Sequence, residues 1–280
     1  MLINHLPKAI VVLLCLLIGP TSLASESKIL RIGGSGTDLS TFRHLSQKFK
    51  QHNQDIIINI LPSLGSSGAV KALKDGKLDI GLLSRKLKNQ EKDARFIAKH
   101  YARTALIFTV NKKSEIQSTN IKNIAAYYSG IEKYWPDGSV VRPILRPQSD
   151  SDMNLLRSVF PKLTRSFEIA YHRKGLPLAV TDQDSADKIS RVPGAIGTST
   201  LALILSENRP LKALKLNNIS ATIKNIENGS YPLVKDLYYV VNNPSKNEVK
   251  HFLTFLTSDT GINILRKTGH QVIHFDAEAL

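Results

Sequence analysis

Two short segments rich in glycine and serine constrain the fold of this chain more than any other feature. GGSGT (33–37) and GSSG (65–68) each follow an apolar run that is typical of a strand. Each is followed by a segment whose apolar residues recur at helical spacing. Because strand, small-residue loop and helix occur twice in succession, the sequence favours an α/β fold with a doubly wound sheet.

The rest of the chain continues this pattern. The first helix is indicated by Leu39, Phe42, Leu45 and Phe49, which are separated by polar residues. Further strands are predicted at 55–61, 78–84, 104–111, 193–204 after a turn, and 231–243, with a strand running into a polar loop at 140–152. Further helices are predicted at 69–77, 121–130, 153–160 and 181–192, and one or two helices at 247–269.

Two long apolar strands bracket the middle of the chain, at 104–111 and 233–242. If both cross between lobes, the chain leaves a first lobe and later returns to it. We therefore predict a first lobe of 25–109 plus 234–280 and a second lobe of 110–233. A ligand would lie in the cleft between the lobes, which would close by a hinge.

The first residues have the pattern of a secretory signal peptide. A positive charge at Lys8 precedes an unbroken apolar run at 9–19, and small residues follow up to an expected cleavage after Ala24. The single cysteine, Cys15, lies in this run, so no disulfide is expected in the mature chain. We predict a signal peptide at 1–24 and a soluble mature protein that is periplasmic or secreted.

The chain carries a formal net charge of +15, which favours acidic partners such as small anions, nucleic acid or anionic lipid. The charges are scattered along the chain, as expected for solvated helix faces. Aromatic residues make up only 6% of the chain, which gives little support for the stacking platforms of single-strand binding. We therefore expect no nucleic-acid partner.

The two small-residue segments suit the binding of a small anion. Glycine lets backbone N–H groups approach a ligand, and the N-terminus of the following helix adds positive partial charge. The hydroxyls of Ser35, Thr37, Ser66 and Ser67 add donors. The alternative is that both segments are ordinary tight turns and helix caps. Neither segment matches a nucleotide-binding motif.

The order of these motifs resembles that of the phosphate-binding proteins of bacterial ABC phosphate importers. The matching stretches are GGSGT, LGSSGAVKALKDGKLDIGLLSRKL (64–87), LRPQSDSD (145–152), VPGAIGTS (192–199), YPLVKDLYYVV (231–241) and FLTSDTGINILRKTGH (255–270). The resemblance implies a two-lobed type II periplasmic binding fold without catalytic activity or cofactor. It also implies a monomer that binds inorganic phosphate or a related oxyanion and delivers it to an ABC permease in the inner membrane.

The resemblance also implies a set of ligand contacts. Thr37 and Ser66 match two phosphate donors of the family. Arg146 matches the arginine whose planar fork binds phosphate oxygens.

Two departures from the family pattern affect the expected ligand. Ser84 lies where some members have an aspartate that accepts the proton of phosphate. Asp150, Ser151 and Asp152 lie where the family usually has a Ser-Gly-Thr anion loop. A carboxylate repels an oxyanion unless the anion has a proton to share. One of the two acids would then replace the missing acceptor, or both would serve only to cap the helix that follows.

Other classes of ligand and of function have weaker support in the sequence. Asp150, Asp152 and Asn154 are spaced like the first ligands of an EF-hand, but Leu155 and Pro161 stand where glycine and glutamate are needed. A secreted hydrolase is an alternative, although the sequence has neither G-x-S-x-G nor H-E-x-x-H. A third alternative is a binding module that signals to a sensor or surface partner.

Overall fold

The computed structural model describes residues 28–273, so the predicted signal peptide lies outside the described residues. The strands are β1 (Lys28–Gly34), β2 (Ile56–Ile60), β3 (Ile80–Leu83), β4 (Phe96–Asn111), β5 (Ser118–Thr119), β6 (Arg142–Pro143), β7 (Ala195–Thr200), β8 (Leu211–Ala213), β9 (Lys215–Leu216), β10 (Val234–Asn242) and β11 (Gln271–Val272). Within this part of the chain, a mixed nine-stranded sheet has the order β2-β1-β3-β10-β4-β7-β6, with β8 and β11 also paired to β4. Strands β5 and β9 form a separate parallel pair.

Helices flank the sheet. They are α1 (Leu39–Phe49), α2 (Gly65–Lys74), α3 (Ile121–Ser129), α4 (Ser151–Val159), α5 (Leu163–His172), α6 (Asp182–Arg191), α7 (Leu201–Ser206), α8 (Ile223–Glu227), α9 (Asn247–Thr257) and α10 (Asp259–Lys267), with a short 3₁₀ helix η1 (Asn89–Glu91). Helix α1 buries the four apolar residues that predicted it, in a core shared with α9 and β1. None of the helices in residues 28–273 has both the length and the apolar character needed to cross a bilayer.

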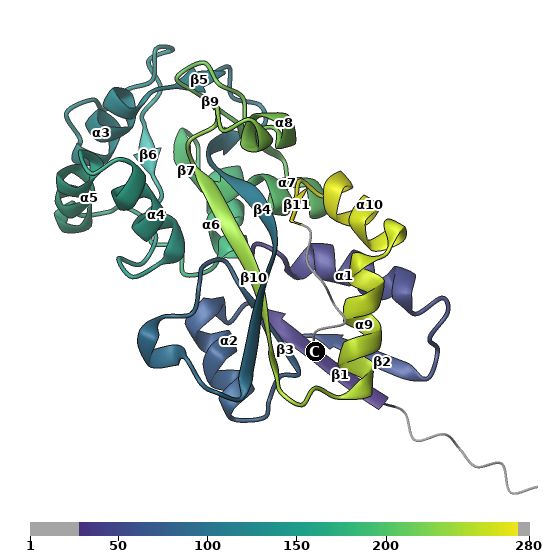
Figure 1. Ribbon diagram of the computed structural model, residues 1–280. Helices are drawn as coiled ribbons and strands as arrows, with labels where there is room; N and C mark the ends of the chain where they lie inside the picture. The colour runs from purple at the N-terminus through teal and green to yellow at the C-terminus, as the bar shows by residue number, and fades with distance from the viewer. Residues whose placement is uncertain (1–27, 274–280) are drawn as a thin grey trace, which may run out of the picture.

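Two lobes are joined by the long strands β4 and β10 (Figure 1). These strands pair antiparallel from Phe96 opposite Asn242 to Ala105 opposite Val234. The first lobe contains β1–β3 with α1, α2, α9 and α10, and the second contains α3–α8, each around its own apolar core. The predicted two-lobed α/β architecture is confirmed. The chain boundaries predicted for the lobes, 25–109 plus 234–280 and 110–233, remain predictions.

Three local predictions were wrong. GSSG (65–68) is not a loop before a helix but the first turn of α2. Residues 201–204 continue not as strand but as helix α7, because the Thr200 hydroxyl accepts a hydrogen bond from the amide of Leu203 and caps it. The strand expected at 140–152 is reduced to β6, a short parallel partner of β7.

Strand β4 begins at Phe96, earlier than the predicted start at 104. Its first half contains charged residues such as Lys99 and Arg103, which hide the strand pattern. This half still pairs with β10, with one register shift near Tyr101, so the joining ribbon extends into the first lobe.

Gly34 ends β1 in a conformation that no other residue can adopt here. Its φ is +143°, and a Cβ at this position would lie 2.1 Å from the carbonyl oxygen of Leu82 in β3. The close approach of β1 to β3 therefore sets the position of the loop that follows, because the Ser35 amide donates to that same carbonyl at 2.8 Å.

We predict that Gly34→Ala destabilises the protein by more than about 3 kcal/mol, since it combines backbone strain with a steric clash in the sheet. Gly76→Ala is the matched control: Gly76 also has positive φ (+64°), but a Cβ there meets nothing within 4 Å. It should cost only about 1–2 kcal/mol. Urea unfolding of both variants measures the difference, and equal losses would contradict the close approach.

Candidate functional site

A polar pocket of about 250 Å³ lies between the two lobes. Its walls include side chains from both lobes, namely Ser35, Ser66, Ser67, Ser84 and Arg85 from the first and Arg146, Asp150, Ser151, Thr181 and Asp182 from the second. Seven of the nine residues predicted for the site are thus brought together here: Ser35, Ser66, Ser67, Ser84, Arg146, Asp150 and Ser151. Thr37 and Asp152 lie behind the wall.

Three helices of the described chain begin at this pocket. Helix α2 presents Gly65, Ser66 and Ser67, and no described side chain caps its N-terminus. Helices α4 and α6 present their first residues and their caps, Asp150 and Thr181. Because a helix N-terminus carries positive partial charge and unpaired N–H groups, this convergence suits an anion.

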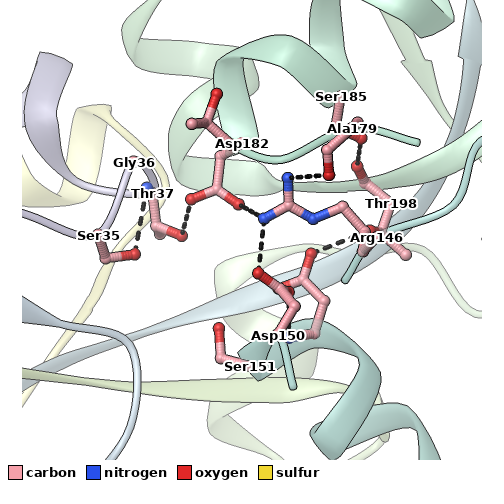
Figure 2. Close-up of polar contacts among 12 residues, drawn as sticks. Ser35, Gly36, Thr37, Arg146, Asp150, Ser151, Ala179, Asp182, Ser185 and Thr198 are labelled. Carbon is pink, nitrogen blue, oxygen red and sulfur yellow. Dashed lines mark hydrogen bonds and ion pairs between the residues drawn. The ribbon is translucent and has the colours of Figure 1, made fainter. Parts of the chain in front are cut away.

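Arg146 provides the central positive charge. It is nearly fully buried, and one of its terminal nitrogens, Nη2, donates to Asp150 at 2.8 Å and to Asp182 at 2.9 Å (Figure 2). Its Nε finds no hydrogen-bond partner among the described residues. Two acids therefore hold the guanidinium in place, and its Nε–H group is still able to donate a hydrogen bond.

Asp150 has two roles in the geometry. One carboxylate oxygen caps α4 by accepting from the amide of Asp152 at 2.8 Å, as one alternative from the sequence proposed, and the other oxygen binds Arg146. Burial and the nearby Asp152 raise the pKa of Asp150 to about 6, against the opposing effect of Arg146. This pocket carboxyl is therefore a weaker acid than an ordinary aspartate.

Asp152 does not line the pocket. Its buried carboxylate forms an ion pair with Lys235 of β10 and accepts from the Thr198 hydroxyl at 2.9 Å. Burial alone would raise the pKa of Asp152, but Lys235 and Arg146 hold it below its usual value. The hydrogen bonds of Asp152 therefore go to protein groups behind the pocket, whereas Asp150 faces the pocket.

Thr37 is also set back from the pocket. Its buried hydroxyl donates to Asp182 at 3.4 Å, across the interface between the lobes. The next residue, Asp38, is fully buried with His270 at 3.2 Å and so fixes the start of α1. The loop at 33–37 therefore meets the pocket through Ser35 and supports it through Thr37.

The sequence did not identify Asp182 or Lys235 as site residues. Asp182 fell only within the helix predicted at 181–192, and Lys235 lay inside an apolar strand segment. A lysine in such a segment was the available signal, because a buried cation requires a partner. Among the described residues, three cations lie in or behind the pocket. Arg146 and Lys235 face three carboxylates, and Arg85 is paired with Glu91.

Residues 19–260 match the family model of a PBP superfamily domain. This match spans most of the chain. The chain belongs to the PBP superfamily. Among curated relatives, Protein SphX of Synechococcus elongatus is 24% identical over 262 residues, covering 85% of this chain and 76% of the relative. Phosphate-binding protein PstS 2 of Streptococcus agalactiae is 32% identical over 83 residues, covering 29% of this chain and 27% of the relative.

Solved structures of PBP superfamily architecture show the same fold. A phosphate ABC transporter substrate-binding protein with bound phosphate from Clostridium perfringens has a TM-score of 0.75 and 19% identity, covering 88% of this chain and 100% of that one. An ABC-type phosphate transport receptor from Vibrio cholerae has a TM-score of 0.61 and 18% identity, and the match covers 86% of this chain and 98% of that one. At these identities, the likeness shows the fold alone.

The raised pKa of Asp150 predicts a measurable pH dependence. Between its usual value of 3.8 and about 6, the folded state binds this proton more tightly than the unfolded state. The stability of the parent should therefore fall, relative to Asp150→Asn, as pH rises through that window. Across the whole window the parent should lose on the order of 1–3 kcal/mol of stability relative to the variant.

Urea unfolding of the ligand-free proteins from pH 4 to 7 tests this. The control is Asp55→Asn, because Asp55 is about half exposed. A parent curve parallel to that of Asp150→Asn would show that Asp150 does not titrate in this range.

Proposed function

We propose that this protein is an extracytoplasmic substrate-binding protein that captures phosphate, or a closely similar oxyanion, and delivers it to an ABC importer. One observation carries the proposal: three helix N-termini and the buried Arg146 converge on one pocket between two lobes. In this role the chain is a monomeric binding protein without cofactor, is located in the periplasm or secreted, and passes its ligand to a membrane permease.

The comparisons support this choice of ligand. Two of the relatives are named for phosphate binding or phosphate transport, and one solved structure of the same fold contains phosphate. The matched fragment of the streptococcal relative is short, so the chemistry of the pocket must carry the ligand assignment.

Hydrogen-bond donors would hold the anion. The free amides at the start of α2 and the hydroxyls of Ser35, Ser66 and Ser67 line one wall, and Ser84 and Ser151 lie near them. On the opposite wall, Arg146 supplies charge, and its hydrogen bonds to acids keep the guanidinium plane fixed. Such charge-assisted bonds are about twice as strong as neutral ones, which favours an oxyanion over an uncharged ligand.

The carboxylates explain how a basic site can select a protonated anion. Asp150 lines the pocket and has a pKa near 6, so its ionised form can accept a hydrogen bond from the P–O–H group of monohydrogen phosphate, and its protonated form can donate one to a phosphate oxygen. Ser84, which stands where some relatives have an aspartate, instead belongs to a hydroxyl network with Ser66 and Ser151. We assign the role of proton acceptor to Asp150 rather than to the ion-paired Asp152.

We predict that Arg146→Lys weakens phosphate binding at least tenfold. Lysine lacks the planar fork, and a hydrogen bond to a charged group is worth about 1.5–3 kcal/mol. Titration calorimetry with inorganic phosphate measures the change. Arg95→Lys is the control, since Arg95 is exposed and paired only with nearby Asp93. Unchanged affinity in Arg146→Lys would remove Arg146 from the site.

We also predict that the parent prefers phosphate and arsenate to sulfate, and that Asp150→Asn reduces this preference. An amide can both donate and accept, so it no longer discriminates against an anion without a proton. Calorimetric titration with each anion gives the ratio of affinities. Asp150→Asn should leave the cap of α4 nearly intact, because asparagine caps about as well as aspartate. An unchanged ratio would mean that Asp150 serves only as a cap.

A further inference from the structure

Lys235 is buried at the junction of the two lobes. It belongs to β10, one of the two strands that join the lobes, where it lies opposite Thr104 of β4. Its side chain is 2% exposed, and it is the only lysine among the described residues that is buried. Besides its ion pair with Asp152, its ammonium group donates to the Ser151 hydroxyl at 3.3 Å.

A chain of hydroxyl groups runs from Lys235 to the pocket. The Oγ atoms of Ser151 and Ser84 are 3.0 Å apart, and those of Ser84 and Ser66 are 3.4 Å apart. The backbone amide of Ser84 also donates to Ser66 Oγ at 3.1 Å. The three serines come from α4, the end of β3 and the first turn of α2, so the chain crosses from the second lobe to the first. All three line the pocket, whereas Lys235 lies behind it.

The ammonium group favours one of the two possible directions of this chain. An ammonium only donates, whereas a serine hydroxyl has one proton to donate and two lone pairs to accept with. Ser151 Oγ accepts from Lys235, so its own proton is available for Ser84. Ser84 in turn has its proton available for Ser66. Ser66 Oγ accepts from the Ser84 amide, and in this direction of the chain it also accepts from the Ser84 hydroxyl, so its proton is left to donate into the pocket.

The charges around Lys235 keep its side chain protonated. Burial alone would lower the pKa of Lys235, but Asp152, Asp182 and Asp150 together raise it above its usual value. The lysine therefore stays protonated at neutral pH and has no lone pair with which to accept from Ser151. Without the lysine, the hydroxyl chain would be free to reverse.

We propose that Lys235 is a positioning residue for anion binding: it orients the Ser151–Ser84–Ser66 hydroxyl chain so that Ser66 presents a donor to the ligand. This inference rests on the proposed function, because it assigns a partner to the anion in that pocket. Through Lys235, strand β10 then contributes to ligand binding, although the lysine itself does not contact the ligand.

A double-mutant cycle tests the proposal, with inorganic phosphate titrated calorimetrically into the mature parent and its variants. Ser66→Ala alone should weaken binding by about tenfold or more, because a hydrogen bond to a charged group is worth about 1.5–3 kcal/mol. In the Lys235→Met background, Ser66→Ala should cost less than about twofold, since Ser66 is then no longer held as a donor. Ser67→Ala is the matched control. Ser67 lines the pocket beside Ser66, but its hydroxyl bonds Glu91 and Arg85, so its cost should be the same in both backgrounds.

A second cycle covers the case in which Lys235→Met does not fold, because that change leaves Asp152 buried without its partner. Ser151→Ala interrupts the chain between Lys235 and Ser84 and leaves the ion pair intact, and it should also reduce the cost of Ser66→Ala. If Ser66→Ala costs the same in every folded background, the proposal is overturned while phosphate binding by the parent still stands. If the parent binds no phosphate, the proposed function fails, and this inference fails with it.

Discussion

The antiparallel pairing of β4 with β10 is the interaction on which the rest of this structure depends. It is the ribbon through which the chain enters and leaves the second lobe, and it extends from Phe96 to Ala105 on one strand. The pocket exists because two lobes with separate cores are held face to face by this ribbon. The same ribbon places Lys235 behind the pocket wall, so one of the two strands that join the lobes also supports the pocket.

The second constraint is electrostatic. Burying charges without partners is costly, and here each buried cation has acids within hydrogen-bond distance. The carboxylates of Asp150 and Asp182 in the pocket wall disfavour a fully ionised anion beside them unless a proton enters with it or is already present on Asp150. The helix N-termini then add positive potential without adding a titratable group. Ligand choice and proton uptake are therefore linked in this site.

Much of the fold was predictable, because periodicity and small-residue turns are local signals. The strand-turn-helix units predicted the first lobe, and the two long apolar runs predicted the strands that cross between the lobes. The local pattern failed in β4 because a tertiary contact decides there: its charged first half is a strand only because β10 pairs with it. At 201–204 the apolar run concealed a local signal, since Thr200 caps a helix there.

The site was predictable where residues belong to compact motifs, as with Ser66 and Arg146. Residues such as Asp182 and Lys235 could not be placed, since their role comes from chain segments far apart in the sequence.

The hydrogen bond between Ser84 and Ser151 spans the gap between the lobes, so separating the lobes must break it. Breaking it disconnects Ser66 from Lys235 and lets the Ser66 hydroxyl rotate away from the ligand. A permease that pulls the lobes apart would therefore do more than widen an exit. The same movement would remove a hydrogen-bond donor from the anion. The bond between the Ser84 and Ser151 hydroxyls would thus couple separation of the lobes to release of the anion.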